Sequence, residues 1–470
     1  MKPIIPDFID SSKEPIYIQL YKKIRDDILS GSIAEGERLP SLRSLAKDLN
    51  ISVTTTQLAY DQLLVEGYIT SRPQSGYYAS QVFPAGENHL AQQIMTPLSD
   101  SSLFSEESTP YICDPDCFDF NKWKKCASRV FSEHSDLLLF GSDPQGEAAL
   151  RHEIAKYVYT SRGVTCLPDQ IVIGAGTQQL TSQLCRILHK MDISHVSLET
   201  PGYLPVQNAF KDRGFSISHI PVGKDGIEIS KLPVNISTAV YTSPSNQFPT
   251  GAVMPVGRRR QLLRWAADND SIIIEDDYDS ELRYFGRPVP ALRSLDQDGP
   301  VVYLGSFSST LFPAIKISYM VLPQDMAGIF SAMKSDYAQT CSKAEQLTLA
   351  LFMEEGYYHT GIRKLRSLYS QKLTATLDAF EKFSDKSVLA VNTNSGISLI
   401  LRVKTTKTAE RLCEEAKSVG LHMTPFSRLT NEQTASIIFY YSELPVRQIR
   451  PLIKQLVSIW KKGPSPGIDK

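Results

Sequence analysis

The chain has 470 residues, of which 42% are hydrophobic, and its 50 Lys and Arg residues nearly balance 51 Asp and Glu residues, giving a formal net charge of −1. This length exceeds that of one compact domain, and no apolar run is long enough to cross a bilayer. We therefore predict a multidomain protein without a membrane span. The charge balance excludes a uniformly basic protein but permits a local DNA-binding face.

The N-terminal stretch MKPIIPDFIDSSKEP lacks the basic flank, apolar core and small-residue cleavage site of a secretory signal, so we expect a cytoplasmic protein. The seven cysteines are scattered and form no Cys-x-x-Cys pair. The sequence therefore predicts no metal site.

The first 80 residues predict three helices and a hairpin. Apolar residues at four-residue steps indicate a first amphipathic helix: Ile16, Leu20, Ile24 and Ile28. Ser41 and Ser52 stand where an N-cap is expected for two further short helices, LRSLAKDLN and VTTTQLAYDQLLVEG. In the latter we expect Val53, Leu58, Leu63 and Leu64 to pack inward. The segment YITSRPQSGYYAS then predicts a β-hairpin, and the whole order is typical of a winged helix-turn-helix.

A small helical domain that touches no nucleic acid is the alternative, because residues 1 to 80 carry nine Lys or Arg against ten Asp or Glu. However, the segments LPSLRSLA and AYDQLLVEGYI resemble the winged helix-turn-helix of GntR-type regulators, which bind double-stranded DNA. The resemblance implies DNA contacts by Arg43, Ser52, Thr54, Thr55, Gln57 and Arg72. Val53 departs from the family, which usually has a polar or basic residue there.

Residues 81 to 110 are polar, contain Ser and Pro, and show no periodicity, so we predict a linker. From Tyr111 to Lys470 the pattern is that of an α/β domain. The segment DQIVIGAGTQQLTSQLCRIL predicts a strand, a tight turn and a helix whose N-terminus at Gly176 and Thr177 is a natural anion seat. Tyr203 and Asn246 follow two later apolar runs.

The stretch from Ser271 to Tyr319 carries the strongest chemical pattern. The apolar run SIIIEDDYDSELRY ends in Asp276 and Tyr278, as a buried parallel strand does at the edge where ligands bind. A Ser-rich turn with Ser306 and Ser308 precedes Lys316. Hydroxyls and a cation suit a phosphate, and a carboxylate suits a protonated ring nitrogen. The alternative is an ordinary doubly wound sheet, whose strands also end in Asp and Ser.

The segments SDPQGEAALR, ETPGYLP, SPSNQFPTG, EDDYDSELRY and YLGSFSSTLFPAIKISY together resemble fold type I aminotransferases, in the MocR and GabR branch of GntR-type regulators. The resemblance implies a pyridoxal 5′-phosphate site and a homodimer. Asp276 would pair with the ring nitrogen, Tyr278 with the 3′-oxygen, and Tyr203 would stack on the ring. Asn246 stands where relatives often have histidine. The phosphate would lie among Gly176, Thr177, Ser306, Ser308 and Lys316.

The family's Schiff-base lysine is replaced here by Ser309, and a hydroxyl cannot form an imine. Lys316 stands where the family has an arginine for the phosphate. Ile438 occupies the place of the arginine that binds the substrate carboxylate, and Arg428 nearby is a candidate replacement. These departures predict a cofactor that is bound non-covalently or not at all, and no catalytic residue. The sequence leaves open whether Ser309 is a natural or an engineered replacement.

The resulting hypothesis is a DNA-binding transcription regulator whose aminotransferase-like domain senses a small-molecule effector, such as pyridoxal phosphate or an amino-acid adduct of it. A working pyridoxal-phosphate-dependent aminotransferase with an accessory DNA-binding module is the alternative. A scaffold that binds neither cofactor nor metabolite is a third.

Overall fold

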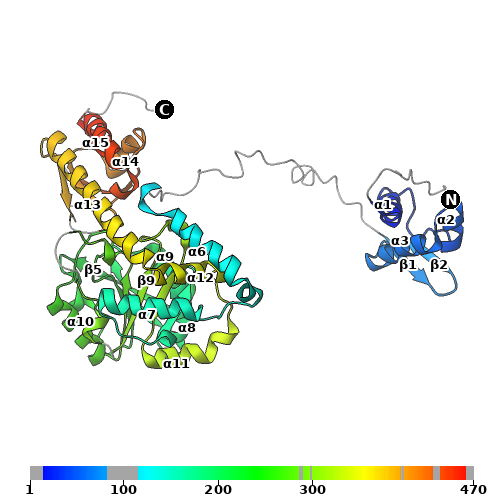
Figure 1. Cartoon of the computed structure of the whole chain (residues 1–470), viewed down its shortest axis with the longest axis horizontal. Helices are drawn as coiled ribbons and strands as arrows, with labels where there is room; N and C mark the ends of the chain where they lie inside the picture. Colours follow the sequence, from blue (N-terminus) through cyan, green and yellow to red (C-terminus); the bar gives the residue numbers. More distant parts are fainter. Residues whose placement is uncertain are drawn as a thin grey trace. The chain divides into compact units, whose positions relative to one another are not determined.

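The computed structural model describes residues 14–81, 115–284, 289–296, 299–391, 393, 396–426 and 434–461. The chain divides into two compact units, Met1–Ser108 and Thr109–Lys470 (Figure 1). Except for Gln81, the predicted linker lies outside the described residues. No helix in the described ranges is both long and apolar enough to cross a membrane.

The N-terminal unit is a three-helix domain with a β-hairpin, as the sequence predicts. Its elements are α1 (Ile16–Leu29), α2 (Leu42–Asp48), α3 (Val53–Val65), β1 (Ile69–Arg72) and β2 (Gly76–Ala79). Ser41 and Ser52 cap α2 and α3, because each hydroxyl accepts a hydrogen bond from a backbone N–H three residues later. Leu20, Ile24 and Ile28 of α1 are buried in the shared core. The predicted winged helix-turn-helix is therefore confirmed.

The buried face of α3 differs from the prediction. The side chains of Val53 and Leu58 are 44% and 48% exposed, and the buried positions are Thr56, Ala59, Tyr60 and Leu63. Tyr60 is held in the core by its hydroxyl, which donates to the Pro40 carbonyl over 3.0 Å. Because the Tyr60 ring is buried, α3 turns a different side toward the core from the apolar side that the sequence predicts. As a result, Val53 and Leu58 face outward.

The C-terminal unit is built on an eight-stranded mixed sheet. Its order is β3-β10-β9-β8-β7-β4-β5-β6, with β9, β8, β7, β4 and β5 mutually parallel. The strands span, in that order, Ile171–Gly174, Ser318–Val321, Val301–Ser306, Ile272–Asp277, Ala239–Thr242, His195–Thr200, Ser216–Gly223 and Gly226–Ile227. The central parallel strands β8 and β7 are buried along their whole length, which explains the apolar runs Ile-Ile-Ile and Ala-Val-Tyr with which they begin.

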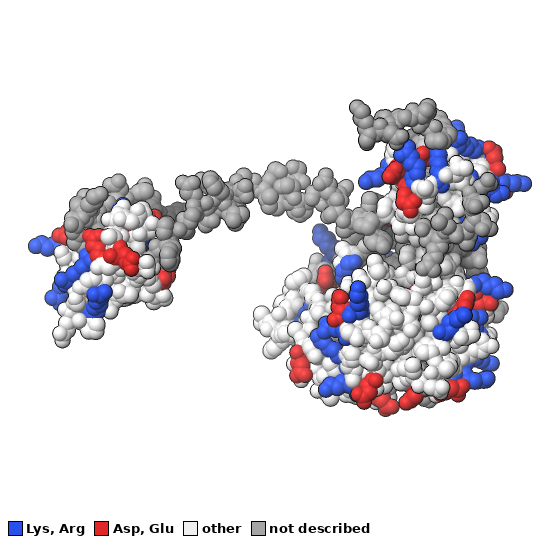
Figure 2. Space-filling view, turned by 180° about the vertical axis from the view of Figure 1, so that it is seen from behind, with Lys and Arg blue, Asp and Glu red and all other residues white. Residues whose placement is uncertain are grey.

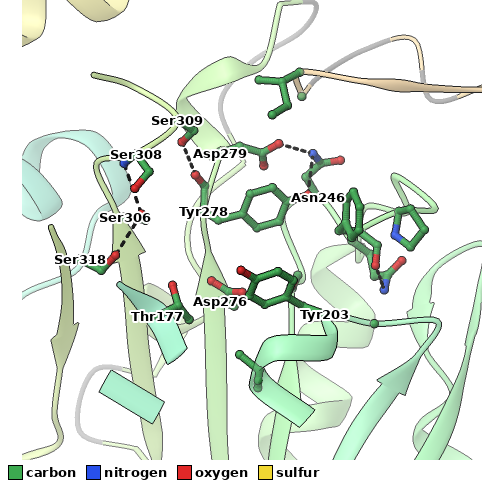
Figure 3. Close-up of a pocket in the computed structure, with 18 of the residues that line it drawn as sticks. Thr177, Tyr203, Asn246, Asp276, Tyr278, Asp279, Ser306, Ser308, Ser309 and Ser318 are labelled. Atoms are coloured by element: carbon green, nitrogen blue, oxygen red, sulfur yellow. Dashed lines mark hydrogen bonds between the residues drawn. The ribbon is translucent and has the colours of Figure 1, made fainter. Parts of the chain in front are cut away.

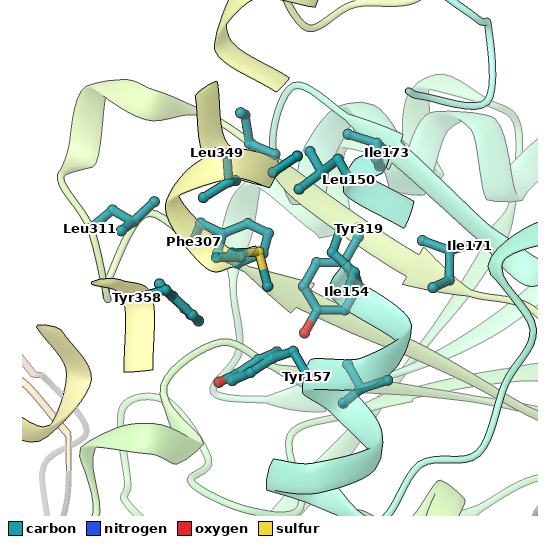
Figure 4. Close-up of a cluster of buried hydrophobic side chains, with 14 of the residues drawn as sticks. Leu150, Ile154, Tyr157, Ile171, Ile173, Phe307, Leu311, Tyr319, Leu349 and Tyr358 are labelled. Carbon is teal, nitrogen blue, oxygen red and sulfur yellow. The ribbon is translucent and has the colours of Figure 1, made fainter. Parts of the chain in front are cut away.

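Helices cover both faces of this sheet, and strand residues alternate between the two cores. Ile171 and Ile173 of β3 pack with α7 (Ala148–Arg162) and α12 (Lys343–Glu354), as Figure 4 shows. Val172 instead packs with α8 (Thr177–Lys190) on the other face. This period of two is the pleat of a strand. The helices around the sheet are α6 (Phe120–Glu133), α7 (Ala148–Arg162), α8 (Thr177–Lys190), α9 (Leu204–Asp212), α10 (Val256–Asp268), α11 (Gln324–Met333) and α12 (Lys343–Glu354).

A smaller layer completes the C-terminal unit. The long helix α13 (Tyr357–Phe383) leads to a four-stranded antiparallel sheet of order β11-β12-β14-β13. Its strands are Val388–Val391, Leu399–Lys404, Thr434–Phe439 and Met423–Pro425 in that order, and α14 (Ala409–Lys417) and α15 (Val446–Lys461) pack on it. The predicted α/β fold of this unit is confirmed.

Candidate functional site

A cavity of about 310 Å³ opens where β4, β7 and β8 end, at the edge of the sheet where the sequence predicts a ligand. All nine residues proposed for the cofactor line this one cavity, and so does Ser309. Figure 3 shows Tyr203, Asp276 and Tyr278 around the same space, with Ser306, Ser308 and Ser318 on another side of it. Segments more than 100 residues apart in sequence therefore form one site.

Asp276 lies at the floor of the cavity near the end of β8. Its carboxylate Oδ2 accepts a hydrogen bond of 2.5 Å from the hydroxyl of Tyr241, which comes from the neighbouring strand β7. Burial raises the pKa of Asp276 to about 7, although the Tyr241 hydrogen bond acts in the opposite direction. A buried carboxylate with this pKa gains from an approaching cation, since the cation offsets the cost of its desolvation.

Asp279 and Asn246 form a second polar pair in the cavity wall. The amide Nδ2 of Asn246 donates to Asp279 Oδ2 over 2.7 Å and lies 3.4 Å from the Tyr278 hydroxyl. Burial holds the pKa of Asp279 well above its usual range. Gly396 packs against this pair, and a Cβ there would lie 3.0 Å from Asn246 Nδ2. The pair thus fixes the position of the Tyr278 ring.

The opposite wall offers hydroxyls and backbone N–H groups. Ser318 Oγ donates to Ser306 Oγ over 3.0 Å, and the Ser308 backbone N–H donates to the same oxygen over 3.3 Å. Helix α8 begins beside them with Gly176 as N-cap, so no capping side chain accepts from its first turn. Lys316 is the only Lys or Arg among the described lining residues. This wall has the chemistry of an anion seat.

Ser309 lies at the edge of the anion seat, half-buried. Its hydroxyl donates to the backbone carbonyl of Tyr278 over 2.6 Å (Figure 3). The side chain is therefore part of the wall and ties the Ser-rich turn to the end of β8.

Glu199 was missed by the sequence reasoning. It lies at the end of β4, lines the cavity, and accepts from the Thr242 hydroxyl over 2.5 Å and from the Ser243 N–H over 3.3 Å. Burial raises its pKa to about 7. Tyr241 and Asp279 were also missed. A polar residue that ends an apolar run, as in Leu198-Glu199, is the signal that would have found Glu199.

A buried ion pair supports the floor of the cavity. Arg162, at the end of α7, places Nε 2.7 Å from Asp277 Oδ2, and both side chains are almost fully buried. The same guanidinium donates to Ser245 Oγ over 2.8 Å, and the Tyr303 hydroxyl donates to Asp277 over 2.6 Å. These contacts hold α7 and the Asn246 loop against the end of β8, next to Asp276.

Three other residues named in the sequence analysis differ in their relation to the cavity. Tyr203 lines the cavity but is 46% exposed. Arg428 lies outside the described residues. Ile438 is buried in β14 and does not line the cavity, whereas Tyr440, two residues later, does.

All the predicted DNA contacts lie in the N-terminal unit. Arg43, Thr54 and Gln57 are exposed. The hydroxyls of Ser52 and Thr55, in contrast, lie 2.8 Å apart and bond to each other as well as to the helix cap. These two residues therefore shape the start of α3.

On the hairpin, the Arg72 guanidinium stacks 4.4 Å from the centre of the Tyr78 ring. Arg38, which the sequence reasoning missed, pairs with Tyr78 in a β-bridge, and its guanidinium passes beside Gly76. Two cations are thus fixed on the wing. Figure 2 shows both Lys or Arg and Asp or Glu on the visible face of each unit.

These two sites define the class of protein: a winged helix-turn-helix module joined in one chain to an aminotransferase-type α/β domain. Residues 16–78 match the family of bacterial regulatory proteins of the gntR type, and residues 114–437 match aminotransferase class I and II. The chain belongs to the family of GntR-type HTH transcriptional regulators that carry an aminotransferase class I and II domain. It is a transcription regulator of the MocR type.

The relatives agree with this assignment. The chain is 36% identical to the uncharacterized HTH-type transcriptional regulator YhdI of Bacillus subtilis, over 97% of this chain and 98% of that protein. It is 32% identical to the probable rhizopine catabolism regulatory protein MocR of Rhizobium meliloti, over 88% and 87%. Among solved structures, LysN of Thermus thermophilus, an alpha-aminoadipate aminotransferase complexed with N-(5′-phosphopyridoxyl)-L-leucine, superposes with a TM-score of 0.64. It shares 23% identity, over 77% of this chain and 98% of that one, and shows the fold.

Proposed function

We propose that this regulator binds double-stranded DNA as a homodimer and that its cavity senses pyridoxal 5′-phosphate, or an amino-acid adduct of it, held without a covalent bond. On this proposal the aminotransferase-like domain is a sensor and has no enzymatic turnover. The proposal rests on one observation: the cavity keeps its acidic floor and anion seat, while Ser309 stands at the position that the family resemblance gives to lysine.

The residues of the cavity fit this cofactor. The buried Asp276 carboxylate would face the protonated ring nitrogen. The positive charge of that nitrogen would lower the raised pKa of Asp276. Tyr278, held by Asn246, would reach the 3′-oxygen, and the exposed Tyr203 ring would stack on the pyridine. Lys316 and the seat at Gly176, Thr177, Ser306 and Ser308 would hold the phosphate. When bound, the cofactor supplies an electron-accepting ring.

Ser309 removes two functions that transamination needs. Its hydroxyl cannot form a covalent link to the cofactor's aldehyde, and it is committed to the Tyr278 carbonyl at 2.6 Å. A lysine at this position would also be the base that moves protons at the bound amine. Lys316 carries the remaining amine among the described lining residues, and on this proposal that amine binds the phosphate at the anion seat.

The test is to measure cofactor binding and covalent attachment separately. Equilibrium dialysis of the full chain should show saturable binding of pyridoxal phosphate, and Asp276→Ala should weaken it. The visible absorbance of a lysine-linked cofactor should be absent, and borohydride should fix no pyridoxyl group on the peptide from Ser308 to Lys316. Ser309→Lys should restore that absorbance. A pyridoxyl group found on Lys316 of the unmodified chain would contradict the proposal.

The alternative function is that of an aminotransferase, and the intact floor of the cavity favours it. Steady conversion of an amino acid and a keto acid by the unmodified chain would establish this alternative and overturn the sensor. If dialysis detects neither the cofactor nor its amino-acid adducts, the C-terminal unit is a scaffold.

The homodimer is supported by apolar side chains that the C-terminal unit leaves exposed. Leu139 and Phe140 lie between α6 and α7 and are 85% and 69% exposed. Two copies would present two winged helices to a repeated or two-fold-related operator. Sedimentation should give twice the chain mass, and Leu139→Asp together with Phe140→Asp should reduce it. A monomer for the unmodified chain would contradict this part of the proposal.

A further inference from the structure

The recognition helix α3 presents an outward face that carries methyl groups and one amide. Val53, Thr54, Gln57 and Leu58 are all exposed. The spacing of Thr54, Gln57 and Leu58 places them on the side opposite the buried Ala59 and Leu63, and Val53 borders this face at the start of the helix. The next exposed residue on this face is Asp61. Contacts to the bases must therefore come from the first two turns, before the acidic residue.

This face has no group that selects guanine. The sequence of α3, VTTTQLAYDQLLV, contains neither Arg nor Lys, the side chains that bond guanine O6 and N7 in the major groove. The methyl groups of Val53 and Thr54 suit the 5-methyl group of thymine, and the Gln57 amide suits adenine N6 and N7. The wing cations, Arg38 and Arg72, lie on other elements.

Burial cannot account for Val53. Its side chain is 44% exposed at the first position of α3, where Ser52 already supplies the cap. An exposed β-branched apolar residue has no stabilising role there, and in a helix that enters the major groove its first residues face the base edges.

We infer that Val53 reads the 5-methyl group of a thymine, so that the base pairs facing α3 in the operator are A·T pairs. This inference rests on the proposed DNA binding and specifies what the recognition helix selects. Contact with a thymine methyl buries apolar surface equivalent to about one methyl group in total, which corresponds to roughly a fourfold gain in affinity.

The test uses the full chain and synthetic duplexes. Duplexes selected from a random pool by binding should be enriched in A·T pairs at one cluster of positions. Replacing each thymine of the selected site in turn by uracil, which lacks only the methyl group, should lower affinity about fourfold at the position that Val53 contacts. In Val53→Ala the thymine duplex should bind about fourfold more weakly, and the uracil replacement at that position should have no further effect.

The matched control is Val65→Ala, since Val65 lies in the same helix and is 87% exposed at its other end. This variant should keep the full difference between thymine and uracil. Equal affinity for thymine and uracil at every position, or a selected site with G·C pairs facing α3, would overturn this inference and leave the DNA binding intact. Failure to bind any duplex would overturn the proposed DNA binding and this inference with it.

Discussion

The two units place their functional side chains in opposite environments. In the N-terminal unit, Arg43, Thr54 and Gln57 lie on the surface and take no part in the core. In the C-terminal unit, Asp276 and Asp279 are buried and are hydrogen-bonded to other lining residues. An exposed site can change its specificity at little cost to the fold. A buried site cannot, because replacing one member of a buried pair leaves the other polar group without its partner and destabilises the domain.

The largest expected effect is on the buried ion pair below the cavity. Arg162→Ala leaves the Asp277 carboxylate buried without its cation, so we expect the free energy of unfolding of the C-terminal unit to fall by about 3–5 kcal/mol. Urea unfolding followed by circular dichroism measures this. Arg411→Ala, which removes an exposed pair with Glu414, should cost less than about 1 kcal/mol. Equal effects of the two variants would remove the contrast between buried and exposed charges.

The second effect is a pH dependence of the free energy of unfolding, which we expect for the buried site and not for the exposed one. The pKa values of Asp276 and Glu199 are raised to about 7 in the fold, so between about pH 4 and pH 7 the unfolded chain releases protons that the folded chain keeps. Stability of the C-terminal unit should therefore fall as pH rises through this window, by up to about 1.4 kcal/mol per pH unit for each group.

Asp276→Asn should remove one of these two contributions and flatten the pH profile. The measurement is urea unfolding of the parent and the variant at a series of pH values. A parent whose stability rises between pH 5 and pH 7 would show that other groups dominate and that the floor of the cavity is already ionised.

The third effect is smaller and falls on the N-terminal unit. Ser52→Ala removes the hydroxyl that accepts from the Thr55 N–H over 3.0 Å, and should cost about 1 kcal/mol of stability in this unit. Thr54→Ala, two residues away and exposed, is the control and should cost less. If Ser52→Ala lowers DNA affinity without any loss of stability, Ser52 is a DNA contact and not mainly a cap.

The smallest effect should appear in the affinity for DNA and in its salt dependence. Arg43→Ala should weaken binding to all sequences alike and reduce the slope of log affinity against log salt by about one, because one phosphate contact is lost. Lys22→Ala on α1, whose ammonium pairs with Glu14, is the control and should leave the slope unchanged. A change of sequence preference in Arg43→Ala would place this residue at a base edge.

Much of both sites could be predicted from the sequence. The caps at Ser41 and Ser52 depend on neighbouring residues only, and the nine cofactor positions follow motifs that come at the ends of strands. The sequence could not reveal the partners of these residues. Tyr241 lies 35 residues from Asp276, and Arg162 lies 115 residues from Asp277. Only the order of strands in the sheet brings such residues together.

The sequence by itself determined the order of elements, the two-domain organisation and the presence of serine at position 309. Tertiary structure decided which side of α3 faces outward. Helical periodicity allowed Val53 and Leu58 to pack inward, but the large Tyr60 ring gains more from burial and its hydroxyl finds the Pro40 carbonyl. Tertiary structure also fixed the Ser309 hydroxyl to the Tyr278 carbonyl and raised the carboxyl pKa values, since hydrogen-bond partners and desolvation exist only in the folded chain.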